Sequence, residues 1–286
     1  MIIDAHHHLW HYDPVEYDWI DGSMEVLKQD FLAAELDETL ARNGIDGSVV
    51  VQARESRIET DWLLSVAVAA ERILGVVGWL DLRATDLESQ LADYEDRAEL
   101  KALRHVLQGE EDRSLVLRRD FRSGLDSLVG IGLGYDMLIF PDQLRFVEEA
   151  CQRVPELRCV LDHAAKPRMA HDEFDDEWAR GISSLARNTD ILCKVSGLVT
   201  EAATDASDDV FEPYLDHLFE QFGQDRLMFG SDWPVCLLRR GYSGVRSLIE
   251  NYASRRGIEL NDRFWGLNAA SFYGLNDQAR DPSAGS

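Results

Sequence analysis

Short apolar runs alternate along this chain with longer segments in which apolar residues recur every three or four positions. There are eight such runs, at 2–9, 47–53, 73–82, 100–107, 135–141, 158–167, 190–198 and 226–234. Continuous apolar runs of this length are typical of strands buried on both faces, and the longer spacing is typical of amphipathic helices. The pattern therefore predicts strands that alternate with helices.

The helical segments carry recognisable end signals. The segment 30–44 closes on Gly44, and the segment 141–155 begins and ends with proline. Two later segments, 210–223 and 244–257, also close on glycine. Glycine is common just after a helix and proline just inside its start, so these positions predict helix boundaries.

Strands that alternate with helices pair in parallel through right-handed crossovers. Eight such units within 1–275 predict a single α/β domain, a (β/α)8 TIM barrel. The alternative is an open doubly wound sheet, which usually has a glycine-rich turn after an early strand, and none is found here. The polar tail 276–286 is expected to be disordered. The long aromatic loop 10–30 is expected to border a pocket.

Composition narrows the function classes. The 286 residues include 53 acidic and 29 Lys or Arg side chains, for a net charge of −24. Such a surface repels nucleic acid and anionic membranes and favours a neutral small ligand. The four scattered cysteines form no CxxC pair, and neither a signal segment nor a membrane span is evident. A cytoplasmic monomer or homo-oligomer with free thiols is expected.

Three consecutive histidines close the first predicted strand. Because side chains alternate along a strand, His6 and His8 are expected to point into the barrel mouth together with Asp4, and His7 toward the helices. The apolar residues of the run are expected on the helix side: Ile3, Ala5 and Leu9.

Asp232 closes the eighth predicted strand, which lies beside the first when a barrel closes. Chemistry in such barrels is built from residues at the carboxyl ends of the strands. His6, His8 and Asp232 are therefore expected to converge as ligands of one divalent ion, with zinc the expected metal. Two buried structural histidines are the alternative explanation.

Other strand ends add candidates for the same site. His163 lies near the end of the sixth predicted strand, toward the barrel mouth, and is a candidate catalytic residue, with a hydrogen-bonded core histidine as the alternative. Arg104 and His105 end the fourth strand, and alternation allows only one of them to face inward. Further candidates for substrate binding are Gln52, Lys194, Trp10 and Trp233, although loop packing is the more frequent explanation for such tryptophans. Asp162 is expected to be structural, and Lys166 either pairs with an acid or faces the site.

These motifs together resemble a known family. "DAHHHLW", "GVVGWLDL", "VLDHAAKP", "KVSGLVTEA" and "RLMFGSDWPVC" are similar to the amidohydrolase-2 branch of the amidohydrolase superfamily, and most of all to its sugar-acid lactonases. The resemblance extends to about Leu275. It implies a metal-type pair at His6 and His8, a catalytic His163, and Asp232 as the group that handles the proton of water.

One departure from the wider superfamily bears on the metal. Members with two ions bridge them with a Lys or Glu at the end of strand four or five, whereas strand five here ends "LIFP". The resemblance therefore implies one ion at most, and an ion that need not be required for activity. Without it, His6, His8, His163 or the strand-four Arg or His would assist the carbonyl group.

The expected reaction is hydrolysis of a small lactone, a sugar aldonolactone from carbohydrate catabolism, with Asp232 as general base on water. One alternative is metal-dependent decarboxylation of an aromatic acid on the same scaffold. Another is hydrolysis of a dicarboxylate lactone, which would call for several arginines where only Arg104 and Arg54 are evident. A non-enzymatic binding module is a fourth possibility, disfavoured by the intact set of strand-end residues.

Overall fold

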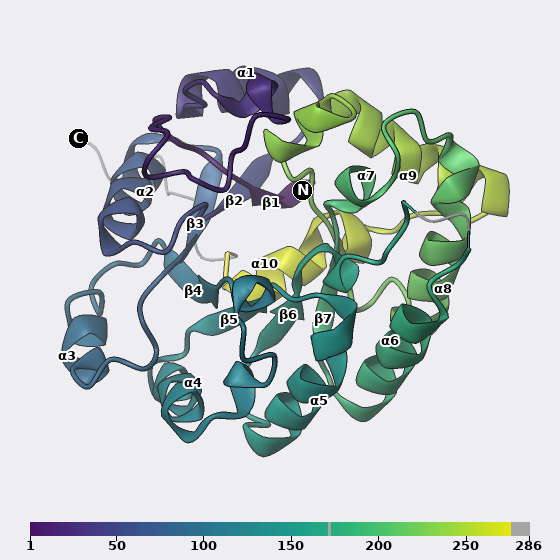
Figure 1. The fold of residues 1–286 in the computed structure, drawn as a ribbon. Helices are drawn as coiled ribbons and strands as arrows, with labels where there is room; N and C mark the ends of the chain where they lie inside the picture. Colours follow the sequence, from purple (N-terminus) through teal and green to yellow (C-terminus); the bar gives the residue numbers. More distant parts are fainter. Residues whose placement is uncertain (171–172, 276–286) are drawn as a thin grey trace.

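Eight parallel strands form the centre of the molecule and hydrogen-bond in chain order, as drawn in Figure 1. The computed structural model describes residues 1–170 and 173–275. The predicted (β/α)8 barrel is confirmed, and the tail 276–286 lies outside the described residues. The strands are β1 (Ile3–His7), β2 (Gly47–Val51), β3 (Ile73–Gly78), β4 (Leu100–His105), β5 (Gly134–Met137), β6 (Cys159–Leu161), β7 (Leu192–Val195) and β8 (Leu227–Phe229).

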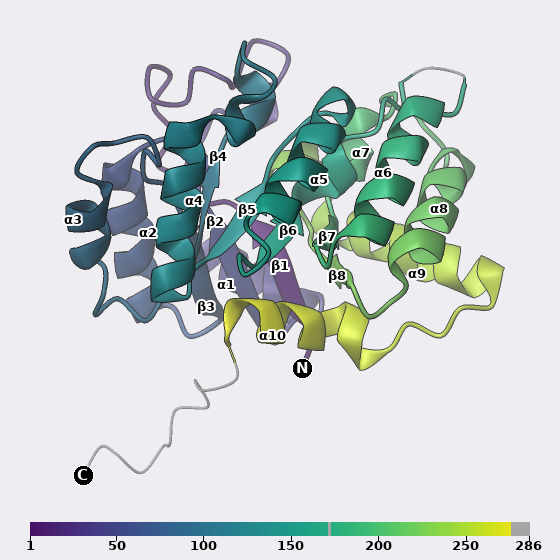
Figure 2. The same ribbon diagram turned by 90° about the horizontal axis from the view of Figure 1, so that it is seen from below.

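Most of the helices form an outer ring around the strands (Figure 1). The helices are α1 (Ala33–Arg42), α2 (Arg57–Ala69), α3 (Leu87–Ala92), α4 (Arg119–Ile131), α5 (Leu144–Arg153), α6 (Asp176–Asn188), α7 (Leu198–Glu201), α8 (Glu212–Phe222), α9 (Tyr242–Arg256) and α10 (Asn268–Tyr273), the last of which lies across one end of the barrel (Figure 2). The spacing of Leu36 and Leu40 buries one face of α1, and the chain leaves this helix at Gly44 with φ of +63°. In the described part of the chain, no helix combines the length and apolar character needed to cross a bilayer.

The barrel closes between β1 and the segment after β8, a junction we call the seam. His8 N donates to Trp233 O at 2.7 Å, and Asp232 N donates to His6 O at 2.8 Å. These two bonds join the carboxyl ends of the first and last strands. The seam therefore brings His6, His8 and Asp232 to one place.

A β-bulge in β1 changes which side chains face inward. The pairing of β1 with β2 shifts between Asp4 and His7, so that Ala5 and His6 both lie on the inner face. The prediction for His6 and His7 holds, but the one that placed Ile3 and Ala5 with the helices and Asp4 inside the barrel is wrong. An extra residue in one strand breaks the strict alternation on which that prediction relied.

The interior of the barrel has an apolar floor below a charged layer. The floor joins small and branched strand residues to α10, which crosses the amino-terminal end of the barrel (Figure 2). Above it lie the buried side chains of Arg104, Asp136, Asp162 and Lys194. The layer of charges lies toward the carboxyl ends of the strands.

Candidate active site

A cavity of about 920 Å³ opens at the carboxyl ends of the strands. The loop 10–30 borders it, as expected, with Val15 and Trp19 among the lining residues. The polar residues at its base that matter for chemistry are His8, Arg104, His163, Lys166 and Asp232. The cavity is therefore formed by loops after several different strands, which is the usual construction of a barrel active site.

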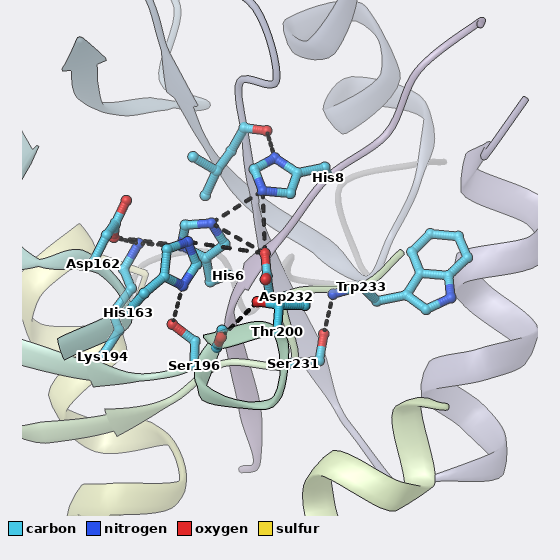
Figure 3. Close-up of polar contacts among 12 residues, drawn as sticks. His6, His8, Asp162, His163, Lys194, Ser196, Thr200, Ser231, Asp232 and Trp233 are labelled. Atoms are coloured by element: carbon cyan, nitrogen blue, oxygen red, sulfur yellow. Dashed lines mark hydrogen bonds and ion pairs between the residues drawn. The ribbon is translucent and has the colours of Figure 1, made fainter. Parts of the chain in front are cut away.

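Three histidines and one aspartate meet at its base (Figure 3). His6 Nε2 lies 3.2 Å from His8 Nε2, and His8 Nε2 lies 3.5 Å from Asp232 Oδ1. His163 Nε2 lies 3.9 Å from the same carboxylate oxygen. All four side chains are buried, so their nitrogen and oxygen atoms face one another in a confined space.

His6, His8 and Asp232 offer ligand atoms that lie within 4.8 Å of one another. His8 Nδ1 lies 2.8 Å from Val51 O, and a carbonyl oxygen can only accept. The neutral imidazole of His8 therefore carries its proton on Nδ1 and turns the lone pair of Nε2 toward the cluster. Two nitrogen donors and one carboxylate beside an open cavity fit a single divalent ion such as zinc.

Asp232 is held as a carboxylate. Burial raises its pKa, but the neighbouring groups, His163 first and then His8 and Lys166, outweigh burial and leave the pKa below its usual value. Burial also lowers the pKa of His163, to about 4, so this imidazole is neutral near pH 7. The site thus pairs an ionised carboxylate with a neutral imidazole, the combination needed for proton transfer.

His163 begins a left-handed turn. The sequence predicts a strand over 158–167, but β6 ends at Leu161, and His163, Ala164, Ala165 and Lys166 have φ of 51°, 49°, 58° and 51°. Such backbone costs about 1–2 kcal/mol for each non-glycine residue, and it persists only where its surroundings hold it. Trp178 Nε1 donates to Ala164 O at 2.6 Å, and Ser196 Oγ lies 2.9 Å from His163 Nδ1.

The structure answers which residue at the end of β4 faces inward. Arg104 borders the cavity, and its NH1 donates to Asp162 Oδ2 at 3.0 Å and lies 3.4 Å from His6 Nε2. His105 lies on the helix side, with its Nε2 2.7 Å from Glu110 Oε1 and its ring against Phe121. The structure therefore gives His105 no position from which to contact a ligand in the cavity.

The remaining substrate-binding candidates lie below or beside the cavity. Lys194 is fully buried under His6, with its Nζ 2.5 Å from Asp136 Oδ2 and 2.9 Å from Asp162 Oδ1. Gln52 is buried and donates from Nε2 to Arg104 O at 3.2 Å. The sequence thus predicts that these polar side chains lie inside the barrel, but not that they lie below or beside the cavity.

Trp10 and Trp233 both pack edge-to-face on Phe31, with ring centroids 5.4 Å and 5.3 Å from it. Both are buried, so the packing alternative describes their position. Trp19, from the same loop as Trp10, borders the cavity instead. An aromatic loop can be predicted from sequence, but which of its rings faces the ligand depends on how the loop folds back.

Asp162 was expected to be structural, and it lies within the charged layer. Burial raises its pKa, but the charges of Lys194, His6 and Arg104 hold the pKa well below its usual value. Its Oδ1 lies 3.4 Å from His6 Nδ1. Asp162 thus orients His6 from beneath and links it to Arg104, a role that its place beside His163 in the sequence could have suggested.

A (β/α)8 barrel with an HxH pair on its first strand and an aspartate after its last defines an amidohydrolase-type site. The chain matches the family model described as Amidohydrolase over residues 3–275. It belongs to the amidohydrolase family, as the resemblance of its motifs predicts.

Two curated relatives carry the same name, L-fucono-1,5-lactonase. The protein from Burkholderia multivorans is 41% identical to this chain over 97% of both chains. The one from Burkholderia ambifaria is 32% identical over 99% of this chain and 98% of its own.

Solved structures share the fold of this chain. The crystal structure of a Burkholderia multivorans amidohydrolase with bound zinc is 39% identical, covers 96% of this chain and 99% of its own, and superposes with a TM-score of 0.91. A probable 2-pyrone-4,6-dicarboxylic acid hydrolase from Acinetobacter baumannii is 15% identical over 96% of this chain and 99% of its own, with a TM-score of 0.77. At that identity the likeness shows the fold alone.

Proposed function

We propose that this protein hydrolyses a small neutral sugar aldonolactone to its hydroxy acid. The observation that carries the proposal is the ionised Asp232, which borders the cavity next to His8 and His163. The two relatives named L-fucono-1,5-lactonase support the same reaction class. Hydrolysis of a lactone requires a base for water and a proton for the leaving oxygen, and this site has groups for both.

In this mechanism Asp232 accepts a proton from a water molecule, and the water oxygen attacks the lactone carbonyl carbon. The electron pair of the carbonyl bond moves to its oxygen, and positively charged groups of the cavity, Arg104 among them, stabilise the resulting oxyanion. The bond from the carbonyl carbon to the ring oxygen then breaks. That oxygen takes the proton that Asp232 accepted from water, directly or by way of His163, and becomes the hydroxyl of the product.

His6, His8 and Asp232 would hold a divalent ion, which would supply Lewis acidity to the carbonyl group. Lactones are reactive esters and need only modest stabilisation of the oxyanion. The cationic side chains of the site supply part of that stabilisation. This reasoning supports a metal that assists the reaction without being strictly required.

The wall of the cavity favours a neutral substrate over a dicarboxylate. Arg104 pairs with Asp162, and Arg54 pairs with Glu16. Four carboxylates border the cavity besides Asp232: Glu16, Asp18, Glu55 and Glu110. A dianion would be repelled by these groups, whereas the hydroxyls of a sugar lactone can donate hydrogen bonds to them.

The test is acid release from a panel of aldonolactones by chelator-treated and zinc-loaded enzyme. We expect turnover of one or two lactones, and its loss by at least 10³-fold in Asp232→Asn, on the scale of removing an essential general base. Asp93→Asn, at an exposed carboxylate that follows α3 and does not border the cavity, is the matched control and should retain full activity. No turnover across the panel in either metal state would reject the proposal and favour decarboxylation.

We also propose that the enzyme works in the cytoplasm. All four cysteines are free thiols, with three of them buried, as expected for a reducing compartment. Fractionation of the source cells with an antibody to the protein tests this placement.

A further inference from the structure

Lys166 lies at the end of the left-handed turn that begins with His163. The turn closes through Lys166 N, which donates to His163 O at 2.8 Å, so it has three residues per turn. Residues three apart in such a turn lie on the same side. Accordingly, His163 and Lys166 both border the cavity, whereas Ala164 and Ala165 are buried behind them.

The segment after β7 holds both side chains. Ser196 Oγ lies 2.9 Å from His163 Nδ1, and Glu201 Oε1 lies 3.6 Å from Lys166 Nζ. Between them, Gly197 has φ of +65°, and a Cβ there would lie 2.4 Å from His163 Nδ1. One short segment thus fixes the positions of the imidazole and the ammonium together.

Lys166 differs from the arginines of the cavity in how its donors are used. Arg104 donates to Asp162 and to Gln52 O, and Arg54 is paired with Glu16. The ammonium of Lys166 lies 3.6 Å from its carboxylate partner, longer than the usual hydrogen bond of about 2.7–3.2 Å. It can therefore turn its hydrogens to a ligand without losing a strong internal bond.

The ammonium borders the same cavity as Asp232 and His163. Its positive charge is one of the influences that lower the pKa of Asp232 and of His163. The partner Glu201 is largely buried, and burial raises its pKa while Lys166 opposes the rise. A partly desolvated ammonium is a stronger electrostatic partner for developing negative charge than one in water.

We propose that Lys166 is a catalytic residue that donates a hydrogen bond to the lactone carbonyl oxygen and stabilises the negative charge that forms there. This inference rests on the lactone hydrolysis proposed above. When the water oxygen bonds to the carbonyl carbon and Asp232 takes its proton, the carbonyl electron pair moves to the oxygen that faces the ammonium. When the bond to the ring oxygen breaks, that pair re-forms the carbonyl and the alkoxide takes the proton. Glu201 is a positioning residue for the ammonium.

The experiment compares Lys166→Met and Lys166→Arg with Lys28→Met. Lys28 offers the same substitution at similar exposure, 26% against 21%, and it pairs with Glu25 away from the cavity. We expect Lys166→Met to lower kcat about 10²-fold with little change in KM, because the contact strengthens only in the transition state. Lys166→Arg should recover at least tenfold, and Lys28→Met should match the wild type. Equal melting temperatures for the variants would show that folding is preserved.

A second substrate separates the carbonyl contact from a contact to a sugar hydroxyl. In Lys166→Met, kcat for a lactone that lacks the hydroxyl next to its carbonyl should fall by the same factor as kcat for the complete sugar lactone. A raised KM with unchanged kcat, or a loss confined to the hydroxylated lactone, would reject the proposal. So would full activity of Lys166→Met in an active wild-type background. An inactive wild type would instead reject lactone hydrolysis itself, and this inference with it.

Discussion

Asp4 and Ser231 are joined by two hydrogen bonds across the seam of the barrel. Ser231 N donates to Asp4 Oδ1 at 2.9 Å, and Ser231 Oγ donates to Oδ2 at 2.6 Å. Tyr242 OH and His6 N donate to the same carboxylate at 2.9 Å and 3.1 Å. Since Ser231 precedes Asp232, whose φ is +56°, the buried carboxylate of the first strand fixes the backbone that carries the proposed base.

We expect Asp4→Asn to misplace Asp232. In the variant, an amide NH2 group replaces one of the two carboxylate oxygens, so a donor would face another donor. This costs about 1–3 kcal/mol of stability. A small displacement of the base should lower kcat by about 10–100-fold with a smaller change in KM. Ser48→Ala, which removes a buried hydroxyl bonded to His7 on the helix side, should lower stability but leave kcat nearly unchanged. Similar kcat values for both variants would show that Asp4 is merely structural.

Glu59 should make stability depend on pH. Burial raises its pKa from 4.5 to about 7, although it accepts hydrogen bonds from Ala53 N, Arg54 N and Tyr17 OH. Between these values the folded state binds more protons than the unfolded state. The contribution of Glu59 is therefore fully present below pH 4.5 and is lost as the pH rises toward 7.

At about 1.4 kcal/mol per pH unit, this contribution amounts to about 3 kcal/mol. Glu59→Gln keeps an acceptor oxygen but cannot ionise, so we expect it to remove this part of the slope in denaturant titrations across pH 4.5–7. Glu35→Gln, an exposed substitution on α1, should keep the wild-type slope. An unchanged slope in Glu59→Gln would show that Glu59 remains charged when folded.

Lys194 holds two carboxylates together inside the barrel. Its Nζ contacts Asp136 and Asp162, and Tyr273 OH from α10 donates to Asp136 at 2.9 Å. Lys194→Met would leave two like charges without their cation, so we expect a loss of about 3–5 kcal/mol in the free energy of unfolding. Adding Asp136→Asn should recover part of that loss. If the double variant is no more stable than Lys194→Met, repulsion between Asp136 and Asp162 does not cause the loss of stability.

Zinc binding should distinguish His8 from its neighbour His7. His8 points its Nε2 at Asp232, whereas His7 contacts Ser48 on the helix side. We expect one zinc per wild-type chain and at least a 100-fold weaker affinity in His8→Gln, on the scale reported for loss of metal-site interactions. His7→Gln should bind like the wild type in equilibrium dialysis with metal analysis. An equal loss in both variants would place the ion elsewhere.

Much of this architecture can be predicted from the sequence, because each strand of the barrel is a short apolar run and several helices have end signals. The convergence of His6, His8 and Asp232 also follows, since the first and last strands of a barrel are neighbours. The bulge in β1 does not follow. It is a local change in pairing register, and alternation alone gives the correct direction for His6 and the wrong one for Ala5.

Two other features could be found only in three dimensions. The left-handed turn at 163–166 contains no glycine, so the sequence "DHAAK" resembles the continuation of a strand. Arg104 and His105 are adjacent polar residues, and both are buried with partners. The sequence does not show which of the two borders the cavity, and the structure shows that it is Arg104.

The seam has a consequence for how the enzyme comes into being. The two bonds that close the barrel, from His8 to Trp233 and from Asp232 to His6, involve the same residues that form the site. A nascent chain that lacks β8 has the histidines but no base, and a chain with an open ring holds them apart. Recovery of activity during refolding therefore reports the docking of the last strand on the first.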